Sequence, residues 1–564
     1  MNKRRLSLKD IDWTSVVVLI MVFVVLGLFI IYPIGKMVLM SFVKPDQPIT
    51  ISNLTMHNFR RFSSSNLYKQ ATLNSIKVSL AIVFFSVLLG VPLAFVVSRI
   101  DIPGKDIISS LSTLPIILPP FVGAYSWIIL RGRNGLITCF VEKVLGITLP
   151  SIYGFRGITL AMCLGYWPLV FLMIQGALSV ADPFLEESAE VMGAGFLRRL
   201  RTIVLPLVSP TIGAAAVTVF MRSIGGFGVP AILGGEYYVL PTLIFFQVAG
   251  YFNLNSACAI SLVCILFSII ALVIMNYVTS KQKAITMTST TREVKQITHP
   301  VAKFFGMLYV VLLLGISLAP HITVVIAAFS EVWAGTPLPT KMGLANFRKV
   351  FTSSMSPLKN SLILALSATL LCAFFGTLVA HTAVRGKTAR GRWLIDATVT
   401  IPFILPGMVV GVALLSAFIN PPLFLAGTGI IVIISYFVRR MPYVFRSAVG
   451  ALEGLDPMLD QASSIMGASW ATTFRKVTMP LIAPSIVASS MITFTTLVGE
   501  LSSTMILYSA RWKTISVAIY EFLVDDALGP ACVLGSIVNV VVLIGMLVAN
   551  KLLGRKMGSM FKAG

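Results

Sequence analysis

The chain has 564 residues, of which 57% are hydrophobic and 12% charged, with a net charge of +23 and a mean hydropathy of +0.91. Soluble domains average about 45–50% apolar and about 25% charged residues, so this composition excludes a soluble globular protein and indicates a polytopic membrane protein. The basic residues lie in short clusters between apolar runs, which excludes a nucleic-acid-binding face and is typical of cytoplasmic loops that contact membrane lipid.

Transmembrane helices of about 20 apolar residues are predicted in twelve windows. The first six windows are 14–36, 73–97, 107–130, 156–179, 209–233 and 256–279. The other six are 304–329, 360–383, 393–417, 424–446, 485–508 and 530–552. With the N-terminus inside, the cytoplasmic segments hold about twice as many Lys and Arg residues as the outer loops. Both termini are therefore predicted to be cytoplasmic.

The longest polar stretch, residues 280–303, reads as a solvated cytoplasmic linker between two halves of six spans each. The predicted first domain is 14–279 and the predicted second domain is 304–552. Residues 1–13 and 553–564 are the predicted cytoplasmic ends. The fold class is thus an all-α polytopic membrane protein with about twelve transmembrane helices.

The two halves are repeats of each other. Residues 177–210 and 451–484 align without a gap at a constant offset of 274, with 12 identities in 34 positions. A second landmark, Leu114-Pro115-Ile-Ile-Leu-Pro119, matches Ile401-Pro402-Phe-Ile-Leu-Pro406. Both halves start inside, so the repeat is parallel and its axis lies along the membrane normal. Such a pair of six-helix repeats encloses one central pathway.

The repeated loop predicts a helix–turn–helix. Asp182 before Pro183 reads as an N-cap, Gly193 as the residue that ends the first helix, and Pro206 as the end of a second segment that carries Arg201. The second copy has Asp456, Gly467, Arg475 and Pro480 at the same spacing. An amphipathic connector lying on lipid headgroups is the alternative, but two copies in register favour docking of a two-fold symmetric partner.

The loop also carries a family resemblance. Glu187-Ser-Ala189-x-x-x-Gly193, followed by Ile-x-Leu-Pro206, resembles the E-A-A-x-x-x-G loop of importer-type ABC permeases, and the second copy has Gln461 in place of the glutamate. The resemblance implies a fused two-domain permease with the type I ABC importer transmembrane fold. It also implies that the loops are coupling helices that insert into two ATPase subunits. The change from Glu187 to Gln461 leaves open whether the two copies dock equivalently.

No G-x-x-x-x-G-K-[ST] phosphate-binding loop occurs, the four histidines are scattered, and no two of the six cysteines form a C-x-x-C pair. We therefore expect no enzyme activity, no metal site and no cofactor in this chain, with ATP and Mg bound by the partner ATPase. The expected partners are a homodimer of ABC ATPase subunits, a periplasmic or lipid-anchored solute-binding protein and membrane lipid, in a bacterial inner membrane. An ion-gradient-driven secondary transporter is the alternative, but the spans hold few ionisable residues for it.

The spans after each loop are expected to line the pathway, and Arg222 and Glu500 stand out as charges inside them. The candidate pathway residues are Arg222, Ser223, Phe227, Gly228, Glu500, Ser502 and Ser503. The offset of 274 brings the two charges to similar depth in opposite halves, so they are predicted to pair as a polar gate. The alternative is that they never meet and that Arg222 extends to lipid phosphate.

The segments FGVPAILGG (227–235) and ELSSTMILYS (500–509) resemble fused permeases of the ferric-iron importer group. The resemblance implies ferric iron as the solute. Relatives of that group that carry hexose phosphates, 2-aminoethylphosphonate, thiamine or polyamines are the alternatives, because the solute-binding protein normally sets the identity of the solute.

Overall fold

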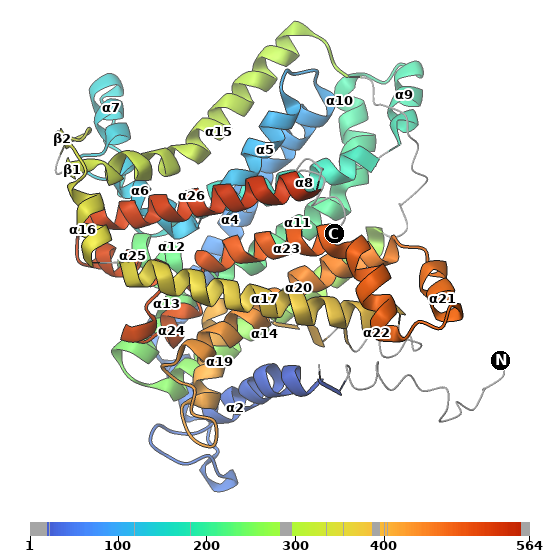
Figure 1. The fold of residues 1–564 in the computed structure, drawn as a ribbon. Coiled ribbons are helices and arrows are strands. Elements are labelled where there is room, and N and C mark those ends of the chain that lie inside the picture. The colour runs from blue at the N-terminus through green and yellow to red at the C-terminus, as the bar shows by residue number, and fades with distance from the viewer. Residues whose placement is uncertain are drawn as a thin grey trace.

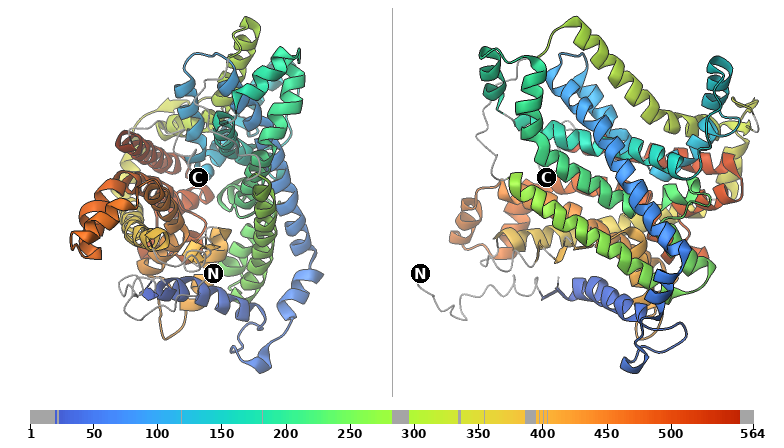
Figure 2. Two further views of the ribbon diagram at one scale, coloured as in Figure 1. Left: turned by 90° about the vertical axis from the view of Figure 1, so that its right-hand side faces the viewer. Right: turned by 180° about the vertical axis from the view of Figure 1, so that it is seen from behind.

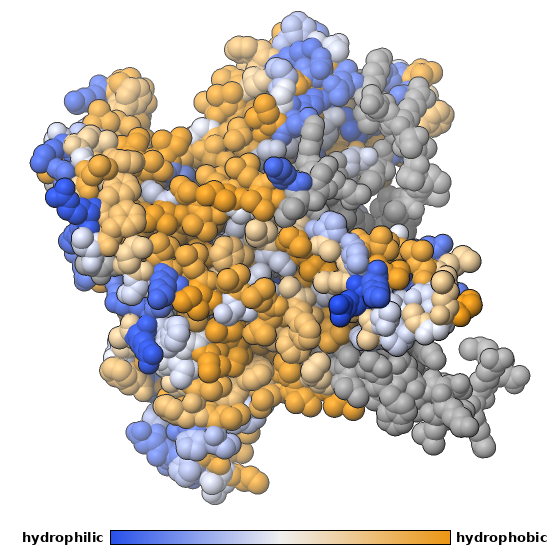
Figure 3. All heavy atoms as spheres, viewed as in Figure 1, coloured by the Kyte–Doolittle hydropathy of each residue, from blue (hydrophilic) through white to orange (hydrophobic). Residues whose placement is uncertain are grey.

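The computed structural model describes residues 20–21, 23–117, 119–180, 182–282, 296–333, 336–353, 355–385, 395–396, 398–399, 401–402 and 404–553. These residues form a bundle of helices with one short antiparallel hairpin, β1 (Ser330–Val332) and β2 (Lys341–Met342) (Figure 1). A broad hydrophobic surface covers the middle of the bundle, and hydrophilic residues gather toward its ends (Figure 3). This distribution is that of a bundle surrounded by lipid.

The helices of the first half are α2 (Tyr32–Ser41), α3 (His57–Ser64), α4 (Asn66–Arg99), α5 (Lys105–Ile117), α6 (Pro120–Arg131), α7 (Leu136–Leu145), α8 (Phe155–Val180), α9 (Pro183–Val191), α10 (Phe196–Arg199), α11 (Leu205–Ile224), α12 (Gly228–Leu233), α13 (Leu240–Phe245) and α14 (Leu254–Gln282). Those of the second half are α15 (Pro300–Ala328), α16 (Ala345–Ser353), α17 (Met355–Arg385), α19 (Gly407–Phe418), α20 (Gly429–Glu453), α21 (Met458–Ile465), α22 (Trp470–Thr473), α23 (Met479–Val498), α24 (Thr504–Leu507), α25 (Ile515–Val524) and α26 (Leu528–Leu553).

Nine helices in the described part of the chain are long and apolar enough to cross a membrane, fewer than the twelve windows. Window 107–130 is divided between α5 and α6, and window 393–417 contains the short helix α19 together with residues outside the described part. Window 424–446 overlaps the helix α20, which begins at Gly429 and carries three arginines. The beginning of window 14–36 lies outside the described residues. Within the described residues the predicted windows coincide with apolar helices, but several of these are not simple spans.

The predicted spans 209–233 and 485–508 are each interrupted at a glycine- and serine-rich segment. The first stops at Ile224 and resumes at Gly228, and the second stops at Val498 and resumes at Thr504. A window of mean hydropathy does not detect such an interruption, because the glycines and small polar residues at the break leave the average apolar.

The first helix of each half packs against the other half. The ring of Phe29, in the turn just before α2, lies 6.0 Å from the ring of Phe418 in α19. Within α2, Lys36 Nζ donates to the Ala417 carbonyl at 3.2 Å. In α15, Ser317 Oγ accepts from Trp167 Nε1 of α8 at 2.9 Å. Viewed along the bundle, α2 lies beside the yellow-to-red helices of the second half (Figure 2). The two halves are therefore interlocked.

The described part of the predicted linker is attached to the end of α4. Ile297 N donates to the Arg99 carbonyl at 2.8 Å, and the Ile297 carbonyl accepts from Asp101 N at 3.1 Å. Lys303 Nζ lies 2.6 Å from Asp101 Oδ2, and this hydrogen bond lowers the pKa of Asp101 below its ordinary value. α15 begins at Pro300, inside the stretch predicted to be linker, with the proline in the favoured first turn.

The repeat is preserved in the packing of the longest helices. α4 crosses α8 at Gly90, where an added methyl carbon would lie 2.8 Å from Val170 Cβ and from the Trp167 carbonyl oxygen. α17 crosses α20 at Gly376, where the corresponding carbon would lie 3.2 Å from Val444 Cβ. Each glycine permits a close helix crossing, as small residues do in membrane bundles.

Gly90→Ala should lower the thermal unfolding midpoint of the detergent-purified protein, since overpacking a tight interior costs about 1–3 kcal/mol. Gly315→Ala is the matched control, because its added methyl carbon would have no atom within 4 Å. Equal midpoints for the two variants would contradict the close crossing.

Candidate functional site

We call residues 182–206 loop A. Asp182 Oδ1 accepts a hydrogen bond of 2.9 Å from Phe184 N and caps α9. The chain turns at Gly193, whose φ of +82° lies in the left-handed region that favours glycine. The short helix α10 follows. The helix–turn–helix predicted for the first half is confirmed.

Loop B, residues 456–480, repeats this geometry. Asp456 Oδ1 accepts from Met458 N at 2.9 Å, and the chain turns at Gly467 with a φ of +80°. The helices on either side of the turn are α21 and α22. α9 and α21 lie at the same end of the bundle, opposite α7, α16 and the β hairpin (Figure 1). The predicted motif is confirmed in both copies.

The prediction that Pro206 and Pro480 end the second segments is wrong. α10 continues through the π-helical turn Leu200–Val204 into α11, and α22 continues through the π-helical turn Phe474–Thr478 into α23. Proline has no N–H for the i→i−4 bond, and the wide turn just before it accommodates the ring without breaking the helix. The second arm of each loop is therefore continuous with the span that follows it.

The remaining predicted loop residues differ in exposure between the copies. Glu187 and Ala189 are half-buried on α9, whereas Gln461, in the place of Glu187, is exposed on α21. Arg201 and Arg475 are exposed in both loops. The ATPase-coupling role of these residues stays a prediction.

The tips of the two loops expose apolar side chains that sequence reasoning missed. Val191 and Met192 in loop A are 89% and 87% exposed, and Ile465 and Met466 in loop B are 86% and 87% exposed. The two pairs are related by the offset of 274 and directly precede the turn glycines. Such exposed apolar pairs, recurring in both halves, are typical of a surface that contacts another protein or the membrane. In the sequence, the tips could have been recognised from the repeated tripeptides Val-Met-Gly and Ile-Met-Gly.

Gly193→Ala should loosen the turn of loop A, because a left-handed conformation costs a residue with a side chain about 1–2 kcal/mol. Amide hydrogen exchange in α9 and α10 should then be faster by about fivefold, the factor that about 1 kcal/mol gives. Gly195→Ala is the control, since added methyl carbons have no neighbours within 4 Å at either position and only Gly193 has a positive φ. The turn has no special role if both variants exchange alike.

The helix breaks that follow the loops pack against the opposite half. A methyl carbon added at Gly225 would lie 2.8 Å from Pro406 Cβ, and one added at Gly499 would lie 2.8 Å from Pro119 Cγ. Gly225 and Gly499 are equivalent by the offset of 274, and the two prolines are the equivalent landmarks of the repeat. The halves therefore touch reciprocally, and the contact leaves no room for a side chain at either glycine.

The structure places the predicted pathway residues at these breaks. Ser223, Phe227 and Ser503 are buried. The Phe227 ring lies 6.2 Å from the ring of Tyr520 in the second half. Gly228 lies in the same interface, and Ser502 is half-buried beside it. The pathway role of all seven residues stays a prediction.

Glu500 is the acidic centre of a charged cluster in the second half. Its Oε1 lies 2.5 Å from Arg439 Nη1, and its Oε2 lies 3.3 Å from Arg440 Nη2. The Tyr443 hydroxyl accepts from Arg440 Nη1 at 3.1 Å and from Arg222 Nη2 at 3.4 Å. We call these five residues the central cluster. Arg222 thus reaches the second half through a tyrosine.

The predicted pair of Arg222 and Glu500 is therefore not formed in this structure. Arg439 and Arg440, on the helix α20, are nearer to the carboxylate and take both of its oxygens. Sequence reasoning missed these arginines although Arg439-Arg440 interrupts the apolar window 424–446. Two adjacent charges in the middle of an apolar run could have indicated a buried partner for Glu500.

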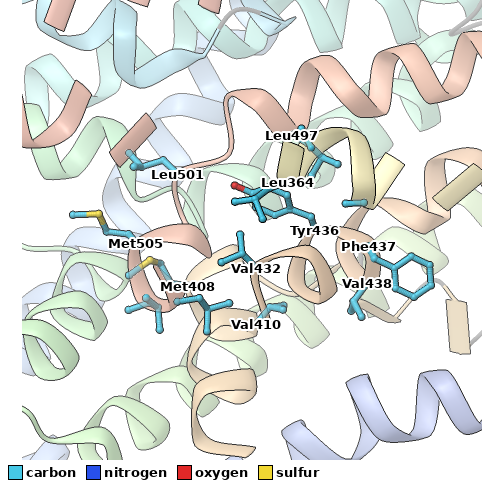
Figure 4. Close-up of a cluster of buried hydrophobic side chains, with 14 of the residues drawn as sticks. Leu364, Met408, Val410, Val432, Tyr436, Phe437, Val438, Leu497, Leu501 and Met505 are labelled. Atoms are coloured by element: carbon cyan, nitrogen blue, oxygen red, sulfur yellow. The ribbon is translucent and has the colours of Figure 1, made fainter. Parts of the chain in front are cut away.

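The central cluster breaks the symmetry of the repeat. The offset of 274 carries Arg439, Arg440 and Glu500 to Gly165, Tyr166 and Gly226, which are uncharged. The cluster combines three guanidinium groups with one carboxylate, a net charge of +2 (3 − 1), in surroundings that include the buried residues Leu497, Leu501 and Tyr436 (Figure 4).

Glu500→Gln should lower the thermal midpoint of the purified protein, because removing one partner of a buried ion pair costs about 3–5 kcal/mol. Glu236→Gln is the control, since Glu236 is exposed and outside the cluster. A midpoint like that of the wild type would show that water already screens the two arginines.

The interlocked halves and the paired loops define a multi-pass membrane subunit with internal two-fold symmetry. The family model described as "Binding-protein-dependent transport system inner membrane component" matches residues 86–283 and 372–558. The chain belongs to this family of inner-membrane permeases.

Two similar proteins match most of the chain. The "Putative ferric transport system permease protein FbpB 1" of Haemophilus influenzae is 28% identical over 514 residues, which are 88% of this chain and 79% of the relative. The "Ferric transport system permease protein FbpB" of Actinobacillus pleuropneumoniae is 28% identical over 484 residues, 83% of this chain and 69% of the relative.

Other relatives match part of the chain. The "Molybdenum transport system permease protein ModB" of Escherichia coli is 33% identical over 212 residues, 37% of this chain and 92% of the relative. Among solved structures, a chain of a bacterial alginate ABC transporter, in complex with an alginate pentasaccharide-bound periplasmic protein, is similar to this chain. The match covers 50% of this chain and 97% of that chain, with 19% sequence identity and a TM-score of 0.38.

Proposed function

We propose that this chain is the permease of an ATP-driven importer that receives ferric iron from a solute-binding protein and passes it to the cytoplasm. The observation that carries the proposal is the similarity to the two ferric permeases, which extends over more than 80% of the chain and so includes both halves. A secondary transporter has no such support.

The proposed partners follow from the symmetry of the loops. Two exposed apolar tips, related by the repeat, suit a homodimer of ABC ATPase subunits, which bind ATP and Mg and hydrolyse the nucleotide. In this proposal loops A and B face the cytoplasm, as do both termini, and the solute-binding protein docks at the end that carries α7, α16 and the β hairpin. In this proposal the ATPase subunits hydrolyse ATP and this chain does not.

An anionic solute, such as a hexose phosphate or 2-aminoethylphosphonate, is the second candidate. Within the described part of the chain, Arg222 has no carboxylate within 4.0 Å, and its polar partner is the Tyr443 hydroxyl. A guanidinium at the interface between the halves suits an oxyanion. The "Putative 2-aminoethylphosphonate transport system permease protein PhnV" of Salmonella typhimurium is 27% identical over 217 residues.

The test is uptake into proteoliposomes that contain the permease with its ATPase subunits and receive the solute-binding protein outside. We expect accumulation of radioactive ferric iron that requires internal ATP and persists when an ionophore removes the proton gradient. Protein lacking the ATPase subunits is the control. Uptake of 2-aminoethylphosphonate without iron would transfer the function to the second candidate, and uptake that follows the proton gradient would exclude both.

A further inference from the structure

Each loop is tied to the longest helix of its own half by an ion pair. In loop A, Glu186 Oε1 accepts from Arg99 Nη2 at 2.7 Å and from Arg99 Nε at 3.1 Å. In loop B, Asp460 Oδ2 lies 2.8 Å from Arg385 Nε. Arg99 is the last residue of α4, and Arg385 is the last residue of α17. Both arginine side chains are largely buried, at 4% and 17% exposure.

The two ion pairs are equivalent in the repeat. The carboxylates are 274 positions apart (460 − 186) and the arginines 286 positions apart (385 − 99), an offset that also relates Gly90 to Gly376. An aromatic contact accompanies each pair: the Phe95 and Phe196 rings lie 5.7 Å apart in the first half, and the His381 and Trp470 rings lie 5.4 Å apart in the second. The carboxylates stand one position before Glu187 and Gln461, so they are distinct from the residues that carry the loop resemblance.

The long helices lead from these pairs to the interior. α17 crosses α20 at Gly376, against Val444. Val444 follows Tyr443, and the same helix carries the arginines that hold Glu500. A continuous series of contacts thus runs from loop B through α17 and α20 to the helix break after α23. In the first half, the positions equivalent to the charged residues of the central cluster hold the uncharged residues Gly165, Tyr166 and Gly226.

The ion pair of loop B has further contacts around it. Arg385 Nη2 donates to the carbonyls of Leu452 and Leu455, at 3.3 and 3.1 Å, at the end of α20. Asp460 Oδ1 accepts from Thr478 Oγ1 at 3.0 Å. One arginine therefore joins α17, the end of α20 and the helix α21.

We propose that Glu186–Arg99 and Asp460–Arg385 are positioning pairs that transmit the movement of docked ATPase subunits to the bundle, and that the second pair controls the central cluster. The inference rests on the proposed function and deepens it. A helix held by apolar contacts alone can slide along its neighbour, whereas a carboxylate bound to a desolvated guanidinium resists that displacement because separation leaves a buried charge unpaired. Each loop then moves as one body with the long helix beside it.

The test compares Asp460→Asn and Glu186→Gln in proteoliposomes with the ATPase subunits and the solute-binding protein. Both variants should still co-purify with the ATPase and keep its basal hydrolysis. Solute uptake per ATP hydrolysed should fall by about fivefold or more for Asp460→Asn, the lower end of typical coupling energies, and by less for Glu186→Gln. Glu190→Gln is the matched control, because Glu190 pairs with Arg199 inside loop A at 2.6 Å and not with α4.

A charge exchange separates positioning from local folding. Arg99→Glu combined with Glu186→Arg should restore most of the uptake per ATP lost in Glu186→Gln, because the pair is re-formed in reverse. Unchanged uptake per ATP in both single variants would overturn the proposal. So would loss of ATPase co-purification that parallels the loss of uptake, since the pairs would then only shape the docking surface. Failure of the proposed function looks different, because the wild type itself would show no ATP-dependent uptake.

Discussion

A helix that stops inside a bilayer must bury the ends of its backbone in protein, because lipid offers no hydrogen bonds. This constraint governs the centre of the molecule, where α11 and α23 both stop at a glycine. Each half uses the other to cover its break, through the contacts of Gly225 with Pro406 and of Gly499 with Pro119. The interlocking of α2 with α19 and of α15 with α8 holds the halves at the distance these contacts need.

The molecule combines a symmetric frame with an asymmetric interior. The loops, the exposed tips, the ion pairs and the glycine crossings all occur twice. The central cluster occurs once, because its charges come mainly from the second half. The second half therefore supplies most of the charged groups at the centre of the bundle. The first half contributes Arg222.

Much of this could be predicted from the sequence. The repeat at a constant offset indicated two equivalent halves, and the capping aspartates and turn glycines predicted loops A and B, because these features depend on neighbouring residues alone. The π-helical turns before Pro206 and Pro480 were missed, since proline ordinarily signals a boundary and only the backbone shows that the helix continues. The two apolar pairs at the loop tips recur in the sequence. Their exposure could not be predicted, because no neighbouring residue distinguishes an exposed Val-Met pair from a buried one.

What the sequence by itself determined was therefore the class of protein, the approximate place of its apolar segments and the local geometry of its loops, which follow from hydropathy, spacing and backbone preference. Only the tertiary structure decided which charges meet. Glu500 pairs with Arg439 and Arg440 and not with Arg222, because the crossing of α20 beside the break places those two guanidiniums nearer to the carboxylate. The same holds for Arg99 with Glu186 and Arg385 with Asp460. Electrostatic energy depends on distance in space, and residues dozens of positions apart acquire that distance only when the helices pack.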